Sequence, residues 1–350
     1  MASRSLALFL RALNNSYQYL QKGEFYARAH LRGFSVVQYD AHDDAQIQLQ
    51  QLRECLASSE SARPKALFVN PVSDSLLTEV ARQAVRLGIP WISLNRTPGH
   101  VTDLRREFPK AAIFCVDPDQ RGVGRLQGQQ FQTLLPAGGE LFYVHGPQFA
   151  SSARLRLGAV QSELSASQIH MTVGGGDWSE ESGFLAAMSW LRSARNRDWG
   201  ACVIGAQNDD MALGAYRALQ HQASARKRPQ LTRVRVTGCD GEPNYGQRLV
   251  AEGVLAATVV IPPTTGRAVD EVATALEVGM GTLADVSLDV TSFPAIEALS
   301  RTVEREMKLK RPGSPSTAST SHSTRGPYRS VFRPTRSVVA ATPLGATAKK

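Results

Sequence analysis

The chain has 350 residues, 42% hydrophobic content and a formal net charge of +9, so it can bury the core of one large domain or of two ordinary ones. Four cysteines without a CxxC pair exclude a disulfide framework, and no apolar run approaches the roughly 20 residues that span a bilayer. Nine of the 40 Lys and Arg residues and none of the 31 Asp and Glu residues lie from Lys308 onward, so the body is neutral and its charge does not favour nucleic-acid binding.

The body repeats one pattern, a short apolar run followed by an amphipathic segment of about 12–18 residues. This alternation predicts βαβ units and parallel sheets that are covered by helices on both faces. The apolar runs predict strands at residues 5–12, 34–40, 65–70, 90–95, 111–117, 140–146, 168–174, 200–206, 233–238 and 255–261. Ten strands are too many for one open sheet of this class, so we expect an α/β fold of two doubly wound lobes.

The last segment, residues 308–350, has a different composition. It is rich in Ser, Thr, Pro and Arg, as in RPGSPSTASTSHSTRGPYRS, and such a segment cannot bury enough apolar surface to offset the entropy of ordering. We therefore expect a disordered basic tail. A basic tail can touch acidic lipid or nucleic acid, but a solvated tail without that role is the favoured interpretation.

Polar side chains follow most of the predicted strands. Any one of them can be a helix N-cap or a turn residue. Together they lie at the carboxyl ends of parallel strands, where ligands bind in open α/β sheets. The amides, carboxylates, arginines and aromatic rings among them suit a ligand with many hydroxyl groups. These segments are NNSYQ (14–18), SLNRT (93–97), SSARLRLG (151–158), GGGDWSEESG (174–183), QNDD (207–210) and GCDGEPNYG (238–246).

Over about residues 5–300 the chain resembles the type I periplasmic binding proteins, specifically the ribose-binding-like sugar receptors that share a core with the LacI-type repressors. The resemblance rests on NNSYQ, ALFVNPVS, GIPWISLNR, SSARLR, NDDMALGAYRAL, VTGCDG and LAATVVIPPTTG, in that order. It implies two Rossmann-like lobes with parallel sheets, joined by three hinge crossings, with the ligand in the cleft. The expected N-terminal lobe is residues 1–117 plus 262–288, and the expected C-terminal lobe is residues 118–261 plus 289–307.

Matched to the motifs of these receptors, nine positions are implied to form the ligand site. They are Asn15, Tyr17, Asn95, Arg96, Arg156, Trp178, Asn208, Asp240 and Ile261. Within QNDD, Asn208 is expected to serve the ligand, whereas Asp209 and Asp210 are expected to serve the helix N-terminus and its dipole. Ile261 stands where such receptors carry a Gln, so a deoxy sugar, another polyol or a less polar ligand becomes more plausible than plain ribose.

The resemblance implies a solute-binding receptor that captures a sugar or sugar-like molecule and delivers it to the membrane permease of an ABC importer. No catalytic residue, metal site or cofactor is expected, because the chain carries neither a GxSxG elbow nor a Walker motif and its histidines are not spaced as ligands. We expect a monomer that does not bind nucleic acid. The alternative is the ligand-sensing domain of a signalling or LacI-type regulatory system.

The family resemblance and the N-terminal segment of the sequence predict different cellular locations. The resemblance implies the periplasm or cell envelope, but LALFL (residues 6–10) fits a first strand better than the core of a signal peptide. A true start lying upstream, or a trimmed chain, reconciles the two, and a cytoplasmic sensor is the alternative.

Overall fold

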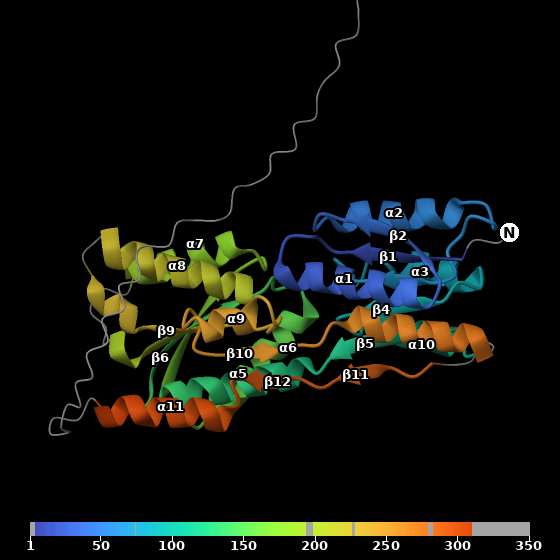
Figure 1. Ribbon diagram of the computed structural model, residues 1–350. Coiled ribbons are helices and arrows are strands. Elements are labelled where there is room, and N and C mark those ends of the chain that lie inside the picture. Colours follow the sequence, from blue (N-terminus) through green and yellow to red (C-terminus); the bar gives the residue numbers. More distant parts are fainter. Residues whose placement is uncertain (1–3, 74, 194–198, 226–227, 279–282, 310–350) are drawn as a thin grey trace, which may run out of the picture. The chain divides into compact units, whose positions relative to one another are not determined.

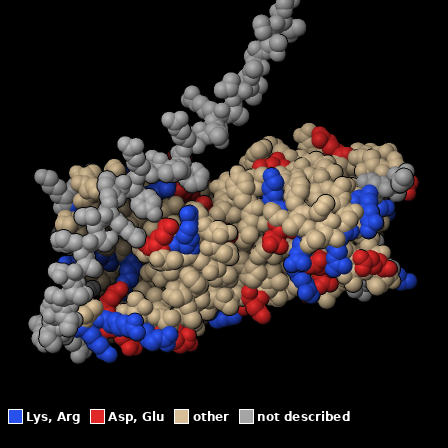
Figure 2. Space-filling view, viewed as in Figure 1, with Lys and Arg blue, Asp and Glu red and all other residues tan. Residues whose placement is uncertain are grey.

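A computed structural model of the chain describes residues 4–73, 75–193, 199–225, 228–278 and 283–309 (Figure 1). The described residues up to Met307 belong to one unit by their contacts. Within the described part of the chain, none of the helices combines the length and the apolar character needed to cross a membrane. On the face shown in Figure 2, basic and acidic side chains are interspersed.

The first sheet has six parallel strands in the order β11-β5-β4-β3-β1-β2. Their bounds are Ser5–Leu10 (β1), Ser35–Asp40 (β2), Leu67–Val69 (β3), Trp91–Leu94 (β4), Ile113–Pro118 (β5) and Val286–Leu288 (β11). The helices around this sheet are Ser16–Leu31 (α1), Ala45–Ala57 (α2), Thr78–Arg86 (α3), Gly99–Glu107 (α4) and Thr264–Val278 (α10). We call this sheet and its helices the first lobe.

Strand β1 shows why helices cover both faces of the first sheet. Every residue of SLALFL is buried, and successive side chains of a strand point to opposite faces. Leu6 and Leu8 pack in a cluster with residues of α1 and α10, whereas Phe9 packs in a second cluster with residues of α2, α3 and α4. Figure 1 shows α1 and α10 lying along one side of this lobe.

The second sheet has four parallel strands in the order β7-β6-β8-β9. Their bounds are Gly139–His145 (β6), Ile169–Gly175 (β7), Cys202–Ala206 (β8) and Arg235–Thr237 (β9). The helices are Gln120–Leu134 (α5), Ser151–Leu164 (α6), Glu180–Ser193 (α7), Asp209–Ala225 (α8), Gly246–Ala251 (α9) and Ile296–Leu309 (α11), with short 3-10 turns at Trp199–Ala201 and Pro229–Arg233. We call this group the second lobe.

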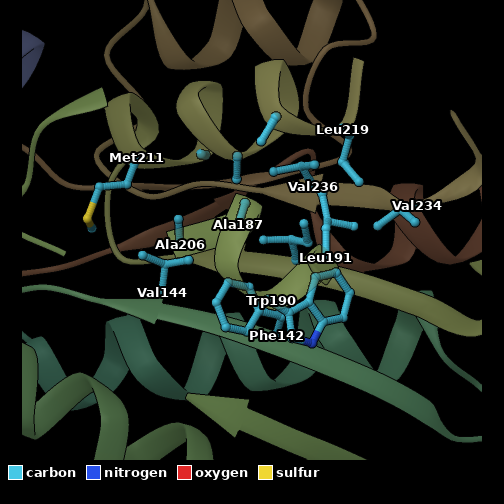
Figure 3. Close-up of a cluster of buried hydrophobic side chains, with 14 of the residues drawn as sticks. Phe142, Val144, Ala187, Trp190, Leu191, Ala206, Met211, Leu219, Val234 and Val236 are labelled. Carbon is cyan, nitrogen blue, oxygen red and sulfur yellow. The ribbon is translucent and has the colours of Figure 1, made fainter. Parts of the chain in front are cut away.

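The core of the second lobe is also double-sided. On one face Phe142, Trp190 and Leu191 pack with residues of α8, and the rings of Phe142 and Trp190 stack with centroids 5.0 Å apart (Figure 3). On the other face Phe131 and Leu299 join a cluster with residues of β6 and α6. Apolar side chains on both faces of one parallel sheet are what the alternating sequence pattern predicts.

The chain passes between the two lobes three times, after β5, between β10 (Thr258–Val260) and α10, and between β11 and β12 (Thr291–Phe293). Strands β10 and β12 pair antiparallel, and β10 also bridges the segment after β9. The predicted fold class, two doubly wound lobes with parallel sheets, is confirmed. The residue boundaries proposed for the lobes remain a prediction.

All ten predicted strands are present, each within a few residues of its expected bounds. Strands β11 and β12 were not predicted, because each is only three residues long and forms through pairing with a distant segment. Residues 308 and 309 of the predicted disordered tail are the last residues of α11, and residues 310–350 lie outside the described part of the chain.

The four cysteines, Cys55, Cys115, Cys202 and Cys239, are buried and form no disulfide. Free cysteine is commonly buried in proteins, where it acts as a small apolar side chain. Among the described residues, no group of three or more His, Cys, Asp and Glu side chains is placed to hold a metal ion.

Candidate functional site

A cavity lies where the carboxyl ends of strands from both sheets meet. Its walls are polar, and segments that follow strands of both lobes contribute to them. The lining residues are Arg11, Asn15, Tyr17, Gln18, Asn70, Asn95, Arg96, Pro118, Gln120, Ser152, Arg156, Trp178, Asn208 and Asp240. This is the position at which open α/β sheets bind ligands.

The structure brings eight of the nine predicted site residues to this cavity. The first lobe supplies Asn15, Tyr17, Asn95 and Arg96, and the second lobe supplies Arg156, Trp178, Asn208 and Asp240. All except Asn95, which is half-buried, are at most 8% exposed. Their contact with a ligand stays a prediction.

Ile261 is the one predicted residue that the structure does not bring to the cavity wall. It is 2% exposed and packs in a small apolar cluster with Tyr17, Val123, Cys239 and Val259. Its backbone N–H donates to the carbonyl of Asp240 at 2.9 Å. Ile261 therefore supports the backbone of a cavity residue from behind, and its side chain is not part of the polar surface.

Four lining residues, Arg11, Gln18, Asn70 and Gln120, are not among the nine predicted positions. Asn70 and Arg11 directly follow the apolar runs of β3 and β1, and Gln120 follows β5. The strand-end rule that selected the other residues would therefore have found them. Gln18 lies in the NNSYQ segment, in the first turn of α1, where its Oε1 accepts from Asn70 Nδ2 at 3.1 Å.

Backbone strain gathers at the cavity. The φ angles of Asn95, Trp178 and Asp240 are 64°, 77° and 105°. They lie in the left-handed region of backbone conformation, which residues other than glycine rarely adopt. Such a residue costs on the order of 1–3 kcal/mol and persists where its surroundings hold it in place. In the described part of the chain only His42 and Asp43 share this property among non-glycine residues. Strain of this kind clusters at functional sites.

Asn95 is held by side chains from two other segments. Its Oδ1 accepts from Gln21 Nε2 at 2.6 Å and from Thr264 Oγ1 at 3.0 Å, and Tyr17 Oη lies 3.4 Å away. Tyr17 also donates to the carbonyl of Pro262, which lies in the second crossing, at 3.1 Å. The Asn95 oxygen is thus committed to the protein, and its amide nitrogen is the group left to serve a ligand.

Arg156 is positioned by hydrogen bonds at two of its three nitrogens. Nε donates to Gln120 Oε1 and Nη1 donates to the carbonyl of Gln207, both at 2.8 Å. Gln120 in turn donates to the carbonyl of Asn95 at 3.2 Å, so this chain of bonds joins the lobes. Helix α6 comes close enough for this because α5 carries Gly124, where a Cβ would collide with the carbonyl of Arg156.

Two guanidinium groups lie near the Trp178 indole. The Cζ atoms of Arg11 and Arg156 are 6.0 and 5.7 Å from the ring centroid, within the range of cation–π attraction. The ring edge rests against Gly146, where a Cβ would overlap the indole. Its buried Nε1–H has no hydrogen-bond partner among the described residues. An unpaired buried donor on a cavity wall calls for an acceptor, and a ligand oxygen would supply one.

Asn208 is hydrogen-bonded to two groups of the second lobe. Its Oδ1 accepts the N–H of Met211 at 2.9 Å, which makes it the N-cap of α8, and its Nδ2 donates to the carbonyl of Trp178 at 2.8 Å. Both polar atoms of the side chain are therefore used inside the second lobe. Asn208 lines the cavity while it caps a helix and anchors the Trp178 segment.

The two carboxylates after Asn208 do more than complement the helix dipole. Asp209 is fully buried and accepts from Thr258 Oγ1 at 2.7 Å and from the N–H of Gly241 at 2.8 Å. Asp210 accepts from Ser16 Oγ at 2.8 Å and from the N–H of Ser16 at 3.2 Å. Both residues lie in the first turn of α8, as expected. In addition, Asp209 is hydrogen-bonded to the β9–β10 region, and Asp210 forms a hydrogen bond between the second lobe and α1 of the first lobe.

Burial dominates the electrostatics of these groups. It raises the pKa of Asp209 to about 7 and the pKa of Asp117 to about 6. Burial also raises the pKa of Asp240 well above its usual range, although the nearby Arg156 charge opposes the shift. The carboxylate of Asp240 is 5% exposed and accepts no hydrogen bond from the described residues. It therefore offers two acceptor oxygens to the cavity.

The sequence is similar to a known protein family and to named relatives. A family model described as "Periplasmic binding protein domain" matches residues 6–279. The ribose import binding protein of Salmonella typhimurium is 26% identical over 266 residues, which cover 75% of this chain and 81% of that relative.

Solved structures have the same fold. An ABC transporter periplasmic solute binding protein of Actinobacillus succinogenes with bound D-allose superposes with a TM-score of 0.72 and 18% identity, covering 85% of this chain and 100% of that one. The Caulobacter myo-inositol binding protein, bound to myo-inositol, superposes with a TM-score of 0.70 and 21% identity, covering 86% and 97%.

Proposed function

The chain belongs to the periplasmic binding protein family, and from this premise we propose that it is a solute-binding receptor that captures a sugar or sugar-like small molecule between its two lobes. The receptor delivers its ligand to the membrane permease of an ABC-type importer. The names of the ribose import relative and of the sugar- and inositol-bound neighbours support this assignment. The proposed role is binding, without chemical conversion of the ligand.

One observation carries the proposal. Amide, carboxylate, guanidinium and aromatic groups from the strand ends of both lobes line a single buried cavity. Asp240 and Asn95 are placed to bind hydroxyl groups, while Arg156 supplies donors in a fixed fork. The indole of Trp178 offers a face on which the C–H side of a sugar ring can stack. A ligand with several hydroxyls satisfies all of these groups at once.

The proposed mechanism is closure of the lobes around the ligand. The cavity takes its wall residues from both lobes, so a bound molecule interacts more strongly with the closed arrangement than with an open one. The three crossings are the proposed hinges. The bonds of Asp210 to Ser16 and of Gln120 to Asn95 join the lobes in the same closed arrangement.

Several further features are part of the proposal. The N-terminal lobe comprises residues 1–117 plus 262–288, and the C-terminal lobe comprises residues 118–261 plus 289–307. The nine sequence-derived residues form the site, with Ile261 acting through the backbone of Asp240. We propose a monomeric receptor in the periplasm or cell envelope that does not bind nucleic acid, consistent with the location named for its family.

A binding screen with one matched pair of variants tests this function. Thermal unfolding is followed with pentoses, hexoses, deoxy sugars and inositols, in neutral and acidic forms. A ligand at about 100 times its Kd adds about 2.7 kcal/mol of stability. Asp240→Asn tolerates the same positive φ and should weaken binding at least about tenfold, whereas the exposed control Asp103→Asn should not. A flat response across the whole panel would refute the proposed function.

A further inference from the structure

The side chain of Gln120 is bonded to both lobes at once. Gln120 is the first residue of α5, where the first crossing ends, and it lies 4% exposed on the cavity wall. Its Nε2 donates to the carbonyl of Asn95 at 3.2 Å and to Oδ1 of Asp117 at 2.9 Å, both in the first lobe. Its Oε1 accepts from Arg156 Nε, in the second lobe, at 2.8 Å. The carboxamide thus uses its two N–H groups and its oxygen in one network.

The first-lobe partners of Gln120 connect it to all three crossings. Asp117 lies in β5, just before the first crossing, and it pairs with Ser287 of β11, just before the third. The side chain of Asn95 accepts from Thr264, the first residue of α10, just after the second crossing. A hinge motion changes the backbone at such crossings. Movement at any crossing therefore alters the groups to which the Gln120 amide is bonded.

Arg156 depends on this amide for its orientation. Its Nε is held by Gln120 and its Nη1 by the carbonyl of Gln207, and Arg156 is 6% exposed. A guanidinium group is planar and rigid, so two fixed nitrogens also fix the direction of the third. Among the described residues, Nη2 has no hydrogen-bond acceptor, and it is the nitrogen left for a ligand oxygen. An arginine that is already oriented loses less side-chain freedom when a ligand binds.

The bond between Gln120 and Asn95 ties the orientation of Arg156 to closure. Gln120 and Arg156 belong to the second lobe and Asn95 to the first, so opening of the lobes stretches the bond at Asn95. We propose that Gln120 is a positioning residue, which orients Arg156 toward the ligand only while its own amide is bonded to the first lobe. This inference rests on the proposed function and adds to it a means by which closure raises affinity. A ligand that contacts Arg156 then favours the closed arrangement by more than its direct contacts alone.

A double-mutant cycle tests the inference. Calorimetric Kd values are compared for the natural protein, Gln120→Met, Arg156→Lys and the double variant. The probe is the tightest-binding sugar or inositol of the thermal screen, beginning with D-ribose, D-allose and myo-inositol. Methionine fills the space of glutamine without its hydrogen bonds, and Gln120→Met should raise the Kd about tenfold. Lysine has no planar fork to orient, so the same change in the Arg156→Lys background should raise the Kd by less than about twofold.

Two other variants separate the parts of this network. Gln120→Glu keeps an oxygen for Arg156 but has no N–H for Asn95, so its Kd should also rise about tenfold. It replaces Gln120→Met in the cycle if that variant does not fold. Gln132, on the same helix, donates to the carbonyl of Glu163 of α6 at 3.0 Å and does not line the cavity. The control Gln132→Met therefore removes a bond between the same two helices, and its Kd should stay within about twofold of the natural value.

The outcomes separate this inference from the function on which it rests. A large effect of Gln120→Met that is lost in the Arg156→Lys background, together with weakened binding in Gln120→Glu, supports the inference. Equal effects in both backgrounds would show that Gln120 does not act through Arg156. A natural Kd in Gln120→Glu would show that the bond to the first lobe has no role. Either result overturns the inference while the receptor function stands. If no sugar or inositol of the screen binds the natural protein, the proposed function fails, and the inference fails with it.

Discussion

Replacing Asn208 with alanine tests how the second lobe builds its side of the cavity. The substitution removes two buried hydrogen bonds at once, from the N–H of Met211 to Oδ1 and from Nδ2 to the carbonyl of Trp178. Loss of an N-cap costs about 1 kcal/mol. A buried carbonyl left without its donor costs about 1–3 kcal/mol more. We therefore expect Asn208→Ala to lower the free energy of unfolding by about 2–4 kcal/mol.

The same change should weaken ligand binding, because Trp178 has a φ of 77° and depends on its surroundings to keep that conformation. We expect a loss of about 1–3 kcal/mol in binding free energy for the ligand of the screen that binds most tightly. Urea denaturation followed by tryptophan fluorescence measures stability, and calorimetry measures the Kd. Asn208→Asp keeps the cap acceptor but cannot donate to Trp178, so its defect should fall mainly on binding.

Asp44→Ala is the matched control. Asp44 caps α2 through bonds to the N–H groups of Gln46 and Ile47, and it does not line the cavity. Its removal should cost about 1 kcal/mol of stability and leave the Kd unchanged. If Asn208→Ala proves no more destabilising than Asp44→Ala and binds ligand normally, the bond to the Trp178 carbonyl has no role in holding the site.

Two further predictions concern Asp210 and Asp209. Ser16→Ala removes the hydroxyl bond to Asp210 that joins the lobes, so closure becomes less favourable and the Kd should rise about two- to tenfold. The control Ser165→Ala loses only a bond within its own turn and should not change the Kd. If both variants bind ligand as tightly as the natural protein, the bond between Ser16 and Asp210 does not contribute to closure. Burial raises the pKa of Asp209 from 3.8 to about 7, so between about pH 4 and pH 7 the folded protein holds a proton that the unfolded chain has lost, and this group's contribution to stability falls as pH rises through that window. The free energy of unfolding of Asp209→Asn minus that of the natural protein should therefore increase from pH 4 to pH 7 in urea titrations, and a difference independent of pH would contradict the assignment.

Much of the fold follows from local patterns in the chain. Apolar runs separated by amphipathic segments predict ten strands that the structure contains, because burial between two helical layers requires apolar side chains on both faces of a strand. The three-residue strands β11 and β12 escape such reasoning. Residues such as VSL and TSF have no periodicity of their own, and only pairing with β5 and β10 makes them strands.

Part of the candidate site could likewise be predicted from the sequence, and part could not. Polar residues after apolar strands, together with the family resemblance, select eight residues that line the cavity. The same reasoning assigns Ile261 to the wall, whereas the structure packs it behind Tyr17 and Cys239. Arg11 was overlooked, although a basic residue directly after a buried strand is itself a strand-end signal.

What the sequence determines by itself is the order of strands and helices and the polar character of the strand ends, because both depend on neighbouring residues. Only the tertiary structure decides which polar atoms remain available to a ligand. The oxygen of Asn95 is occupied by Thr264, 169 residues away, and the carboxylate of Asp210 by Ser16, 194 residues away. The cavity wall likewise forms when strand ends from distant segments converge. Hydrogen bonds between residues so far apart in the sequence depend on how the lobes pack and close. No local sequence pattern encodes this packing.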